Sequence, residues 1–222
     1  MKNNKVIIVG GGTGSRMGTD IPKQFLLLRG KPVIMHTIER FRNFSSSLEI
    51  TVVLPKNQFE YWHELCKQHK FNIPHKLVEG GITRFASVKN GINSISEAGL
   101  VAIHDAVRPL VSIDTIKNCF KEAEEKGNCI PVLEIKESIR KVDSEGKTKS
   151  VERKDYYTVQ TPQVFEYSIL KRAYEQPYQA SFTDDSSVVE NIGIKINISM
   201  GNSGNIKITI KEDLQIAEVL LK

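Results

Sequence analysis

The chain has 222 residues, of which 40% are hydrophobic and 26% charged, and its formal net charge is +5. This composition excludes disordered, collagen-like and membrane-embedded classes, and the length suits one large α/β domain or two small ones, of which we favour one. The 31 basic residues exceed the 26 acidic ones only mildly and form no long run, which disfavours a nucleic-acid surface and favours a small anionic partner.

Targeting and redox signals are weak. The longest apolar runs, such as residues 6–9, are too short to cross a bilayer or to form a signal-peptide core, so we expect a cytoplasmic protein without membrane attachment. Cys66, Cys119 and Cys129 show neither CxxC nor metal-ligand spacing, and we expect them to be reduced packing residues.

Short β-rich segments alternate with helical patterns over the first 134 residues. Strands are predicted at residues 5–9, 49–54, 76–79, 101–104 and 129–134. Helices are predicted at residues 32–44, from the cap Asn57 with Phe59, Trp62 and Leu65 inward, at 87–95, and at 113–126 with Gly127 as the stop. This alternation predicts a mostly parallel sheet covered on both faces, with ligands at the carboxyl ends of its strands.

Residues 137–155 break this rhythm. The segment is polar and turns at residues 143–146, so it reads as a β-hairpin. Two isolated strands bury too little to be stable alone, which suggests that this arm leans on a second copy of the protein; the alternative is a floppy surface excursion.

The remaining chain returns to mixed structure. We expect an extended segment at 157–165, a helix near 167–175, another beginning near 183–185, strands at 195–199 and 206–209, and a last helix at 212–221.

The first strand runs into GGGTGSRM, residues 10–17, followed by PKQF at residues 22–25. Glycines at a strand end let backbone N–H groups approach a phosphate closely. The spacing fits neither a P-loop nor a dinucleotide fingerprint. Arg16 and Lys23 lie close enough in sequence to surround one bound triphosphate, although two solvated surface cations are the alternative.

Two further motifs end predicted strands. GGITRFASV, residues 80–88, places Arg84 and Ser87 at the start of a helix. HDAVRP, residues 104–109, presents Asp105, a carboxylate that can hold Mg²⁺ against phosphate oxygens or can simply cap a turn, and Arg108 follows it. His104 is expected to be packed.

Taken together, GGGTGSRM with PKQF, GGITRFASV, HDAVRP, SVER, QTPQVF, TDDSSV and NIKIT closely resemble the 2-C-methyl-D-erythritol 4-phosphate cytidylyltransferases. The match runs from end to end. The resemblance implies one Rossmann-like, three-layer α/β/α nucleotidyltransferase domain over residues 1–222, with a β-hairpin dimerisation arm at about 136–156. It also implies CTP and a polyol phosphate as substrates, Mg²⁺ as cofactor, and a homodimer.

The resemblance also implies roles for individual residues. Arg16, Lys23 and Lys207 would surround the triphosphate and the transition state, with Asp105 beside the metal. Cytosine and ribose would be held by Gly10, Gly11, Gly12, Thr13, Gly14, Gly81 and Ser87. The methylerythritol phosphate would be bound by Arg108, Ser138, Arg153 and Thr161, several of them reaching across the dimer.

This chain departs from the family pattern at two positions. Ile82 stands where a family member has an acidic residue, so any contact there must come from backbone, and Ser138 replaces a threonine while keeping the hydroxyl. Lys207 could otherwise be an ordinary strand-edge lysine. Two other functions stay open: a ribitol 5-phosphate cytidylyltransferase, and a nucleotide-sensing module without turnover, which the retained charged residues disfavour.

Overall fold

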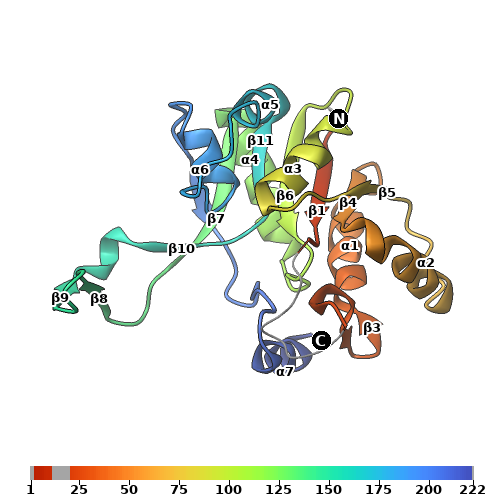
Figure 1. The fold of residues 1–222 in the computed structure, drawn as a ribbon, viewed down its shortest axis with the longest axis horizontal. Helices are drawn as coiled ribbons and strands as arrows, with labels where there is room; N and C mark the ends of the chain where they lie inside the picture. Colours follow the sequence, from red (N-terminus) through yellow and green to blue (C-terminus); the bar gives the residue numbers. More distant parts are fainter. Residues whose placement is uncertain (1–2, 12–20, 222) are drawn as a thin grey trace.

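The computed structural model describes residues 3–11 and 21–221 of the chain. Its centre is a sheet with the strand order β10-β7-β11-β6-β1-β4-β5, to which β12 adds beside β7 (Figure 1). The strands of this sheet are β1 (Lys5–Val9), β4 (Glu49–Leu54), β5 (Lys76–Glu79), β6 (Leu100–Asp105), β7 (Asn128–Glu134), β10 (Tyr157–Val159), β11 (Gln163–Glu166) and β12 (Ile198–Met200).

Parallel pairing dominates this sheet. β1 lies between β4 and β6, β5 flanks β4, and all three pairs are parallel, as is the pair of β12 with β7. β11 runs antiparallel between β6 and β7, and β10 runs antiparallel to β7. The structure therefore confirms the predicted α/β class with a mostly parallel mixed sheet.

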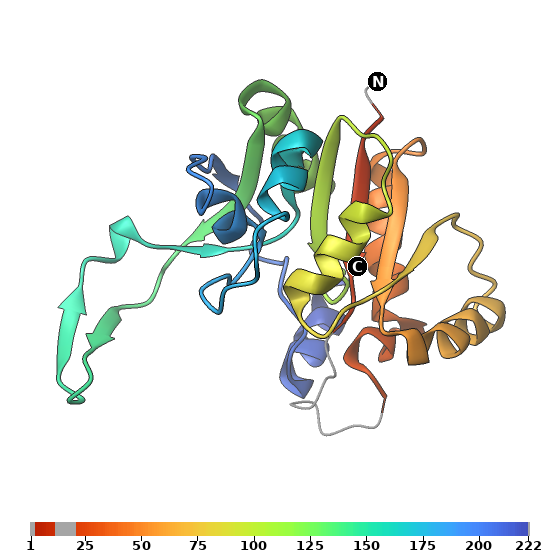
Figure 2. The same ribbon diagram turned by 45° about the horizontal axis from the view of Figure 1, so that its top comes forward.

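Helices cover both faces of the sheet because the strand residues alternate between two cores (Figure 2). Val6 and Ile8 join the core beneath α1, α2 and α4, whereas Ile7 and Val9 join the core beneath α3, α5 and α6. The helices are α1 (Val33–Phe44), α2 (Phe59–Gln68), α3 (Arg84–Asn93), α4 (Ile113–Lys126), α5 (Tyr167–Ala173), α6 (Asp185–Glu190) and α7 (Lys211–Leu220).

Shorter elements complete the fold. Single 3₁₀ turns lie at η2 (Lys23–Phe25), η3 (Lys56–Gln58) and η4 (Arg153–Asp155), and β2 (Leu27–Leu28) pairs with β3 (Lys31–Pro32). A third, smaller apolar cluster joins α7 to β2 and to the segment after β6. Across residues 3–11 and 21–221, no helix has the length and apolar character needed to cross a bilayer.

Several predicted boundaries are correct. α4 begins after Ser112, whose side chain accepts a hydrogen bond from Thr115 N, and ends at Gly127, which adopts φ +83°. Both signals are local, so the sequence contains all that is needed to find this helix. Ile34, Ile38 and Phe41 are buried on one face of α1, as their spacing predicts.

Other predicted boundaries are wrong. Asn57 does not cap α2, because Pro55 begins a 3₁₀ turn that contains Asn57 and delays the helix to Phe59. α3 begins at Arg84, earlier than expected, because the Thr83 side chain accepts a hydrogen bond from Ala86 N and caps it.

The C-terminal half differs most from expectation. The expected extended segment at 157–165 is divided into two strands, β10 and β11, and the Thr161–Pro162 peptide bond between them is cis. Residues 206–209 form no strand, and Ile208 N instead donates to Val107 O in a loop. β12 is shorter than the predicted strand at 195–199 and begins later.

The hairpin arm is present. β8 (Ile139–Val142) pairs antiparallel with β9 (Thr148–Val151) in a separate two-stranded sheet, and the pair extends away from the body (Figures 1 and 2). Its turn is held by Asp143 Oδ1, which accepts hydrogen bonds from Glu145 N and Lys147 N, and by Gly146 at φ +78°. Most arm residues are exposed within one chain.

Candidate active site

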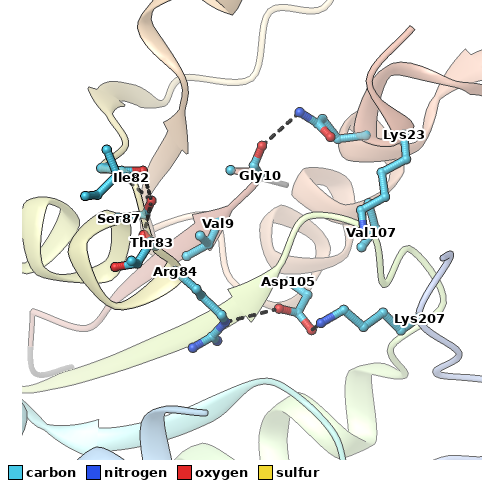
Figure 3. Close-up of a pocket in the computed structure, with 13 residues that line it drawn as sticks. Val9, Gly10, Lys23, Ile82, Thr83, Arg84, Ser87, Asp105, Val107 and Lys207 are labelled. Carbon is cyan, nitrogen blue, oxygen red and sulfur yellow. Dashed lines mark hydrogen bonds and ion pairs between the residues drawn. The ribbon is translucent and has the colours of Figure 1, made fainter. Parts of the chain in front are cut away.

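A pocket of about 190 Å³ opens at the carboxyl ends of β1 and β6, beside the loop that follows β5 (Figure 3). Residues 9–11, 23–24, 81–84, 105 and 107 line it together with Ser87 and Lys207. Because carboxyl ends of parallel strands meet at one edge of a sheet, motifs far apart in the sequence face each other here. The location is the one predicted for ligand binding.

Asp105, the last residue of β6, lies at the centre of a cluster of cations. Lys207 Nζ lies 3.0 Å and Arg108 Nε 3.1 Å from its Oδ2, and Arg84 Nε lies 3.7 Å from its Oδ1. Burial alone would raise the pKa of Asp105, but the charges of Lys207, Arg84 and Arg108 outweigh it and hold that pKa well below its usual range. The carboxyl group is therefore ionised at neutral pH.

A buried hydrogen-bonded group supports Asp105 from behind. Asp105 N donates to Thr161 Oγ1 at 3.2 Å, and this hydroxyl also contacts His104 Nδ1 at 3.0 Å. The other ring nitrogen of His104 contacts Arg108 O. Burial lowers the pKa of His104 to about 4, so the ring is neutral at physiological pH. His104 is packed, as predicted.

The glycines after β1 allow the chain to pass very close to its neighbours. Gly10 N donates to Val53 O, and a Cβ on Gly10 would lie 2.7 Å from Leu54 Cδ2. A Cβ on Gly11 would lie 3.2 Å from Ser87 Oγ. Gly10 and Gly11 therefore line the pocket through backbone. Four other predicted residues of this loop, Gly12, Thr13, Gly14 and Arg16, lie outside the described residues.

The loop after β5 is folded tightly onto the start of α3. Ser87 Oγ accepts a hydrogen bond from Gly81 N at 3.1 Å and donates to Thr83 O at 2.9 Å. A Cβ on Gly81 would lie 2.4 Å from Ala86 Cβ, so this position requires glycine. Ile82 is fully exposed at the pocket mouth, and its side chain offers no polar atom to a ligand.

Lys23 and Gln24 lie in η2 on the side of the pocket opposite α3 (Figure 3). Gln24 is completely buried, and its Nε2 lies 2.8 Å from Gly10 O and 2.7 Å from Gln58 Oε1. This contact fixes η2 against the end of β1. Lys23 is thereby placed across the pocket from Arg84.

Lys207 reaches the pocket from a segment without regular secondary structure. Asn205, completely buried, donates to Thr161 O at 2.8 Å, and its own carbonyl accepts from Arg108 at 2.8 Å. Ile208 N donates to Val107 O at 2.9 Å. These bonds on either side of Lys207 aim its ammonium group at Asp105.

The predicted substrate-binding residues are divided between two places. Arg108 lies beside Asp105, and Thr161 is buried behind it with its hydroxyl already in contact with protein atoms. Ser138 and Arg153 belong to the arm, which extends away from the central sheet and its helices (Figure 2). The Arg153 guanidinium donates to Lys136 O. Their roles in binding stay predictions.

The sequence assigned no role to two residues of the site, Arg84 and Gln24. Arg84 lines the pocket and pairs with Asp185, and Gln24 joins η2 to β1. Arg84 belongs to GGITRF and Gln24 to PKQF. Their positions, at a strand end and close after the glycine loop, were the only features that could have indicated them. Their partners lie far away in sequence, and no local pattern indicates them.

The residues of this site fit a divalent cation that is held by one protein carboxylate together with phosphate oxygens of a substrate. Among residues 3–11 and 21–221, no group of three or more His, Cys, Asp or Glu side chains is placed to form a protein cage for a metal. Mg²⁺ in nucleotide-processing sites is commonly held by one or two carboxylates together with substrate phosphates. Asp105 supplies one such carboxylate at the edge of the pocket.

Comparison with known proteins assigns the family. The family model described as "IspD: 2-C-methyl-D-erythritol 4-phosphate cytidylyltransferase" matches residues 5–222. The chain belongs to this family. Curated relatives of that name include one from Phocaeicola vulgatus, 51% identical over 99% of this chain and 100% of its own length, and one from Bacteroides thetaiotaomicron, 48% identical over 97% and 98%.

Solved structures agree with this assignment. A 4-diphosphocytidyl-2C-methyl-D-erythritol synthase from Anaerococcus prevotii superimposes with a TM-score of 0.85 at 25% identity, covering 99% of this chain and 96% of that one. A 2-C-methyl-D-erythritol 4-phosphate cytidylyltransferase from Francisella tularensis gives 0.81 at 31% identity, covering 99% and 100%. The cytidylyltransferase fold is thus shared over nearly all of the described chain.

Proposed function

We propose that this protein transfers a cytidylyl group from CTP to 2-C-methyl-D-erythritol 4-phosphate, giving 4-diphosphocytidyl-2-C-methyl-D-erythritol and pyrophosphate in isoprenoid precursor biosynthesis. The observation that carries the proposal is the contact of Lys207 and Arg108 with Asp105 at the strand ends, with Arg84 close beside them. Relatives that share about half of its residues bear the name of this activity.

The reaction needs alignment and charge rather than a side-chain nucleophile. A phosphate oxygen of the acceptor attacks the α-phosphorus of CTP in line, and the bond from that phosphorus to the bridging oxygen breaks. Pyrophosphate leaves with the bonding electron pair. Lys23 and Lys207 both line the pocket and would neutralise the negative charge that builds up in the transition state.

Nucleotide binding follows from the two close-packed loops. Backbone at Gly10, Gly11 and Gly81 would contact the nucleotide, with Ser87 holding the second loop in shape. Gly12, Thr13 and Gly14 would also contact the cytosine and ribose, and Arg16 would contact the triphosphate.

Mg²⁺ is the divalent cation we propose for this reaction. Asp105 would hold it together with phosphate oxygens of CTP. The ion supplies charge neutralisation at the phosphates when it is bound.

The acceptor would bind between the pocket and a partner's arm. Arg108 and Thr161 lie on the pocket side, whereas Ser138 and Arg153 lie on the protruding arm. We therefore propose a homodimer in which each arm closes the partner's site, in the cytoplasm and without nucleic acid or membrane as partner. We also propose that residues 1–222 form one nucleotidyltransferase domain.

The experiment that tests this function is pyrophosphate release with each of the four nucleoside triphosphates, in the presence and absence of 2-C-methyl-D-erythritol 4-phosphate. We expect release with CTP only when the acceptor is present. Ribitol 5-phosphate replaces the acceptor in a parallel series. Preference for that acceptor, or CTP binding without release in any series, would overturn the proposal.

A further inference from the structure

Arg84 and Asp185 form a buried ion pair beside the pocket. The two terminal nitrogens of Arg84 donate to the two oxygens of Asp185 at 2.9 Å and 2.6 Å, in a bidentate arrangement. The Asp185 side chain is completely buried, whereas that of Arg84 is about one-third exposed and lines the pocket. The two residues are 101 positions apart in sequence.

Asp185 is held rigidly by its own surroundings. Tyr174 OH donates to Asp185 Oδ1 at 2.6 Å. The backbone at Asp185 begins α6, whose first turn is capped by Asp184 through Ser187 N at 2.9 Å. Gln163 of β11 contacts both Asp184 and Ser186 N, which joins this turn to the sheet. The acceptor for the Arg84 guanidinium therefore has a fixed position.

Stability alone is a weak reason for this pair. Burying a carboxylate against a guanidinium costs about as much in desolvation as the attraction returns, and apolar replacements of such pairs are often neutral. The pair has a clear geometric effect instead. Because both terminal nitrogens of Arg84 face Asp185, its Nε is left 3.7 Å from Asp105 Oδ1, which is beyond hydrogen-bond distance.

The two oxygens of Asp105 consequently differ. Oδ2 has Lys207 at 3.0 Å and Arg108 at 3.1 Å, whereas the Arg84 Nε near Oδ1 stays at 3.7 Å. We propose that Asp185 is a positioning residue, which holds the Arg84 guanidinium away from Asp105 and so keeps Oδ1 open to a divalent cation. This inference rests on the proposed function and adds a specific residue to it.

The chemical reason is competition for one oxygen. A guanidinium released from Asp185 would turn its terminal nitrogens toward the nearest carboxylate, because arginine and carboxylate favour a bidentate pair. That carboxylate is Asp105. The Arg84 guanidinium would then occupy Oδ1 of Asp105 and would have to be displaced before Mg²⁺ or Mn²⁺ could bind there.

Opposite effects of two single variants test the proposal. Asp185→Asn keeps the shape and releases Arg84, and we expect Mn²⁺ affinity to fall about tenfold or more. Arg84→Met removes the competing charge, and we expect Mn²⁺ affinity to be unchanged or higher. Mn²⁺ is titrated into each protein and followed by its electron paramagnetic resonance spectrum, with CTP present, the acceptor absent and CTP alone as the blank.

The double variant Arg84→Met/Asp185→Asn removes both charges, so neither is left buried without its partner. It keeps the proposal testable if a single variant fails to fold. We expect it to fold, as judged by circular dichroism, and to bind Mn²⁺ at least as tightly as the native protein. Equal loss of Mn²⁺ affinity in both single variants, or a tenfold loss in the double variant, would mean that the pair only supports the fold, and would overturn the proposal.

A crystal structure of Asp185→Asn gives a second readout, in which the Arg84 guanidinium should contact Asp105. A guanidinium that stays in its native place would also overturn the inference. Failure of the proposed function is recognised separately, because the native protein would then release no pyrophosphate from CTP and acceptor.

Discussion

Lys207 and Asp105 show how the charges of the pocket depend on each other at the scale of single residues. Lys207 Nζ lies 3.0 Å from the buried carboxylate, yet its side chain is 40% exposed. An anionic ligand entering the pocket can therefore reach this ammonium group without any rearrangement of the surrounding backbone. The same lysine pairs with Asp105 in the free protein and, in the proposed function, would face the ligand in the complex.

We expect Lys207→Ala to reduce kcat by about two to three orders of magnitude with a small change in thermal stability, because the lost charge acts mainly on the transition state. Lys23→Ala should behave in the same way. Pyrophosphate release at saturating CTP and acceptor measures the effect. Lys126→Ala is the matched control, since Lys126 also pairs with a carboxylate, Glu122, but on an exposed helix surface. An unchanged kcat in both pocket variants would contradict the assigned roles.

His75 provides a residue-scale prediction about pH. Trp62 Nε1 donates to His75 Nε2 at 3.0 Å, and the other ring nitrogen contacts Ile73 O at 2.8 Å, so the native ring is neutral. Burial lowers the pKa of His75 below its usual value. The unfolded chain therefore takes up a proton at a higher pH than the native chain, and stability should fall as the pH drops below about 6.5.

This effect is measured as the free energy of unfolding from pH 8 down to pH 5, with Trp62, the one tryptophan of the chain, as fluorescent reporter. His75→Gln keeps an acceptor for the indole without a titrating ring, and its pH dependence should be flatter than that of the native protein. Equal slopes in the two proteins would contradict the assignment.

At the scale of elements, helix ends are set by local signals, and the end of α4 shows this. Gly127 adopts φ +83°, and a Cβ there would lie 3.3 Å from Ile169 Cδ1. Gly193, close after α6, has a similar φ of +80° with nothing within 4 Å of a Cβ. A side chain at Gly193 would meet backbone strain alone, whereas one at Gly127 would meet the same strain and a close contact with Ile169.

We expect Gly193→Ala to lower the free energy of unfolding by about 1 kcal/mol, from left-handed backbone strain alone. Gly127→Ala should cost more than this because Ile169 must also move. Urea denaturation of both variants gives the comparison. A smaller loss for Gly127→Ala than for Gly193→Ala would show that the contact with Ile169 does not matter.

Elements defined by neighbouring residues could be predicted from the sequence, and elements defined by distant contacts could not. β1, β4, β5 and α4 have the predicted bounds, because alternation, caps and a terminal glycine are all local. The bend between β10 and β11 depends on Gln160 and Thr161 bonding to residues near 205, and residues 206–209 pair with a loop instead of a strand.

The candidate site follows the same rule. Glycines and charges at strand ends indicated Gly10, Lys23, Gly81 and Asp105, and all four line one pocket. The pair of Arg84 with Asp185 joins two motifs through space, so the sequence contains both residues but no sign that they meet. Roles assigned to the arm stay predictions, because they require a second chain.

At the scale of the whole molecule, the residues of the proposed site are divided between the pocket and the protruding arm. The pocket holds Lys207 and Asp105, whereas Arg153 and Ser138 lie on the arm. Val142 and Tyr156 on the arm are 59% and 49% exposed, and Tyr157 next to the arm is 42% exposed. Exposed apolar side chains next to an unsupported hairpin favour burial against a second copy.

Mixing two inactive variants tests this arrangement. Lys207→Ala disables the pocket and Arg153→Ala disables the arm, so a mixed dimer keeps one intact site, made of the pocket of one chain and the arm of the other. After unfolding and refolding an equal mixture, we expect about a quarter of native activity from random pairing in a two-fold dimer. Sedimentation equilibrium checks the dimer. Activity no higher than that of the separate variants would show that each chain completes its own site.

The segment that carries Lys207 has a consequence for hydrogen exchange. This segment is joined to the body by a few hydrogen bonds, such as the backbone bond from Ile208 N to Val107 O and the side-chain bond from Asn205 Nδ2 to Thr161 O, and not by a ladder like that of β6. Amides at 203–209 should therefore exchange with deuterium much sooner than those of β6, although both line one pocket. Occupation of the pocket by nucleotide should slow exchange at 203–209 most, which makes this short stretch a sensitive reporter for compounds that compete with CTP.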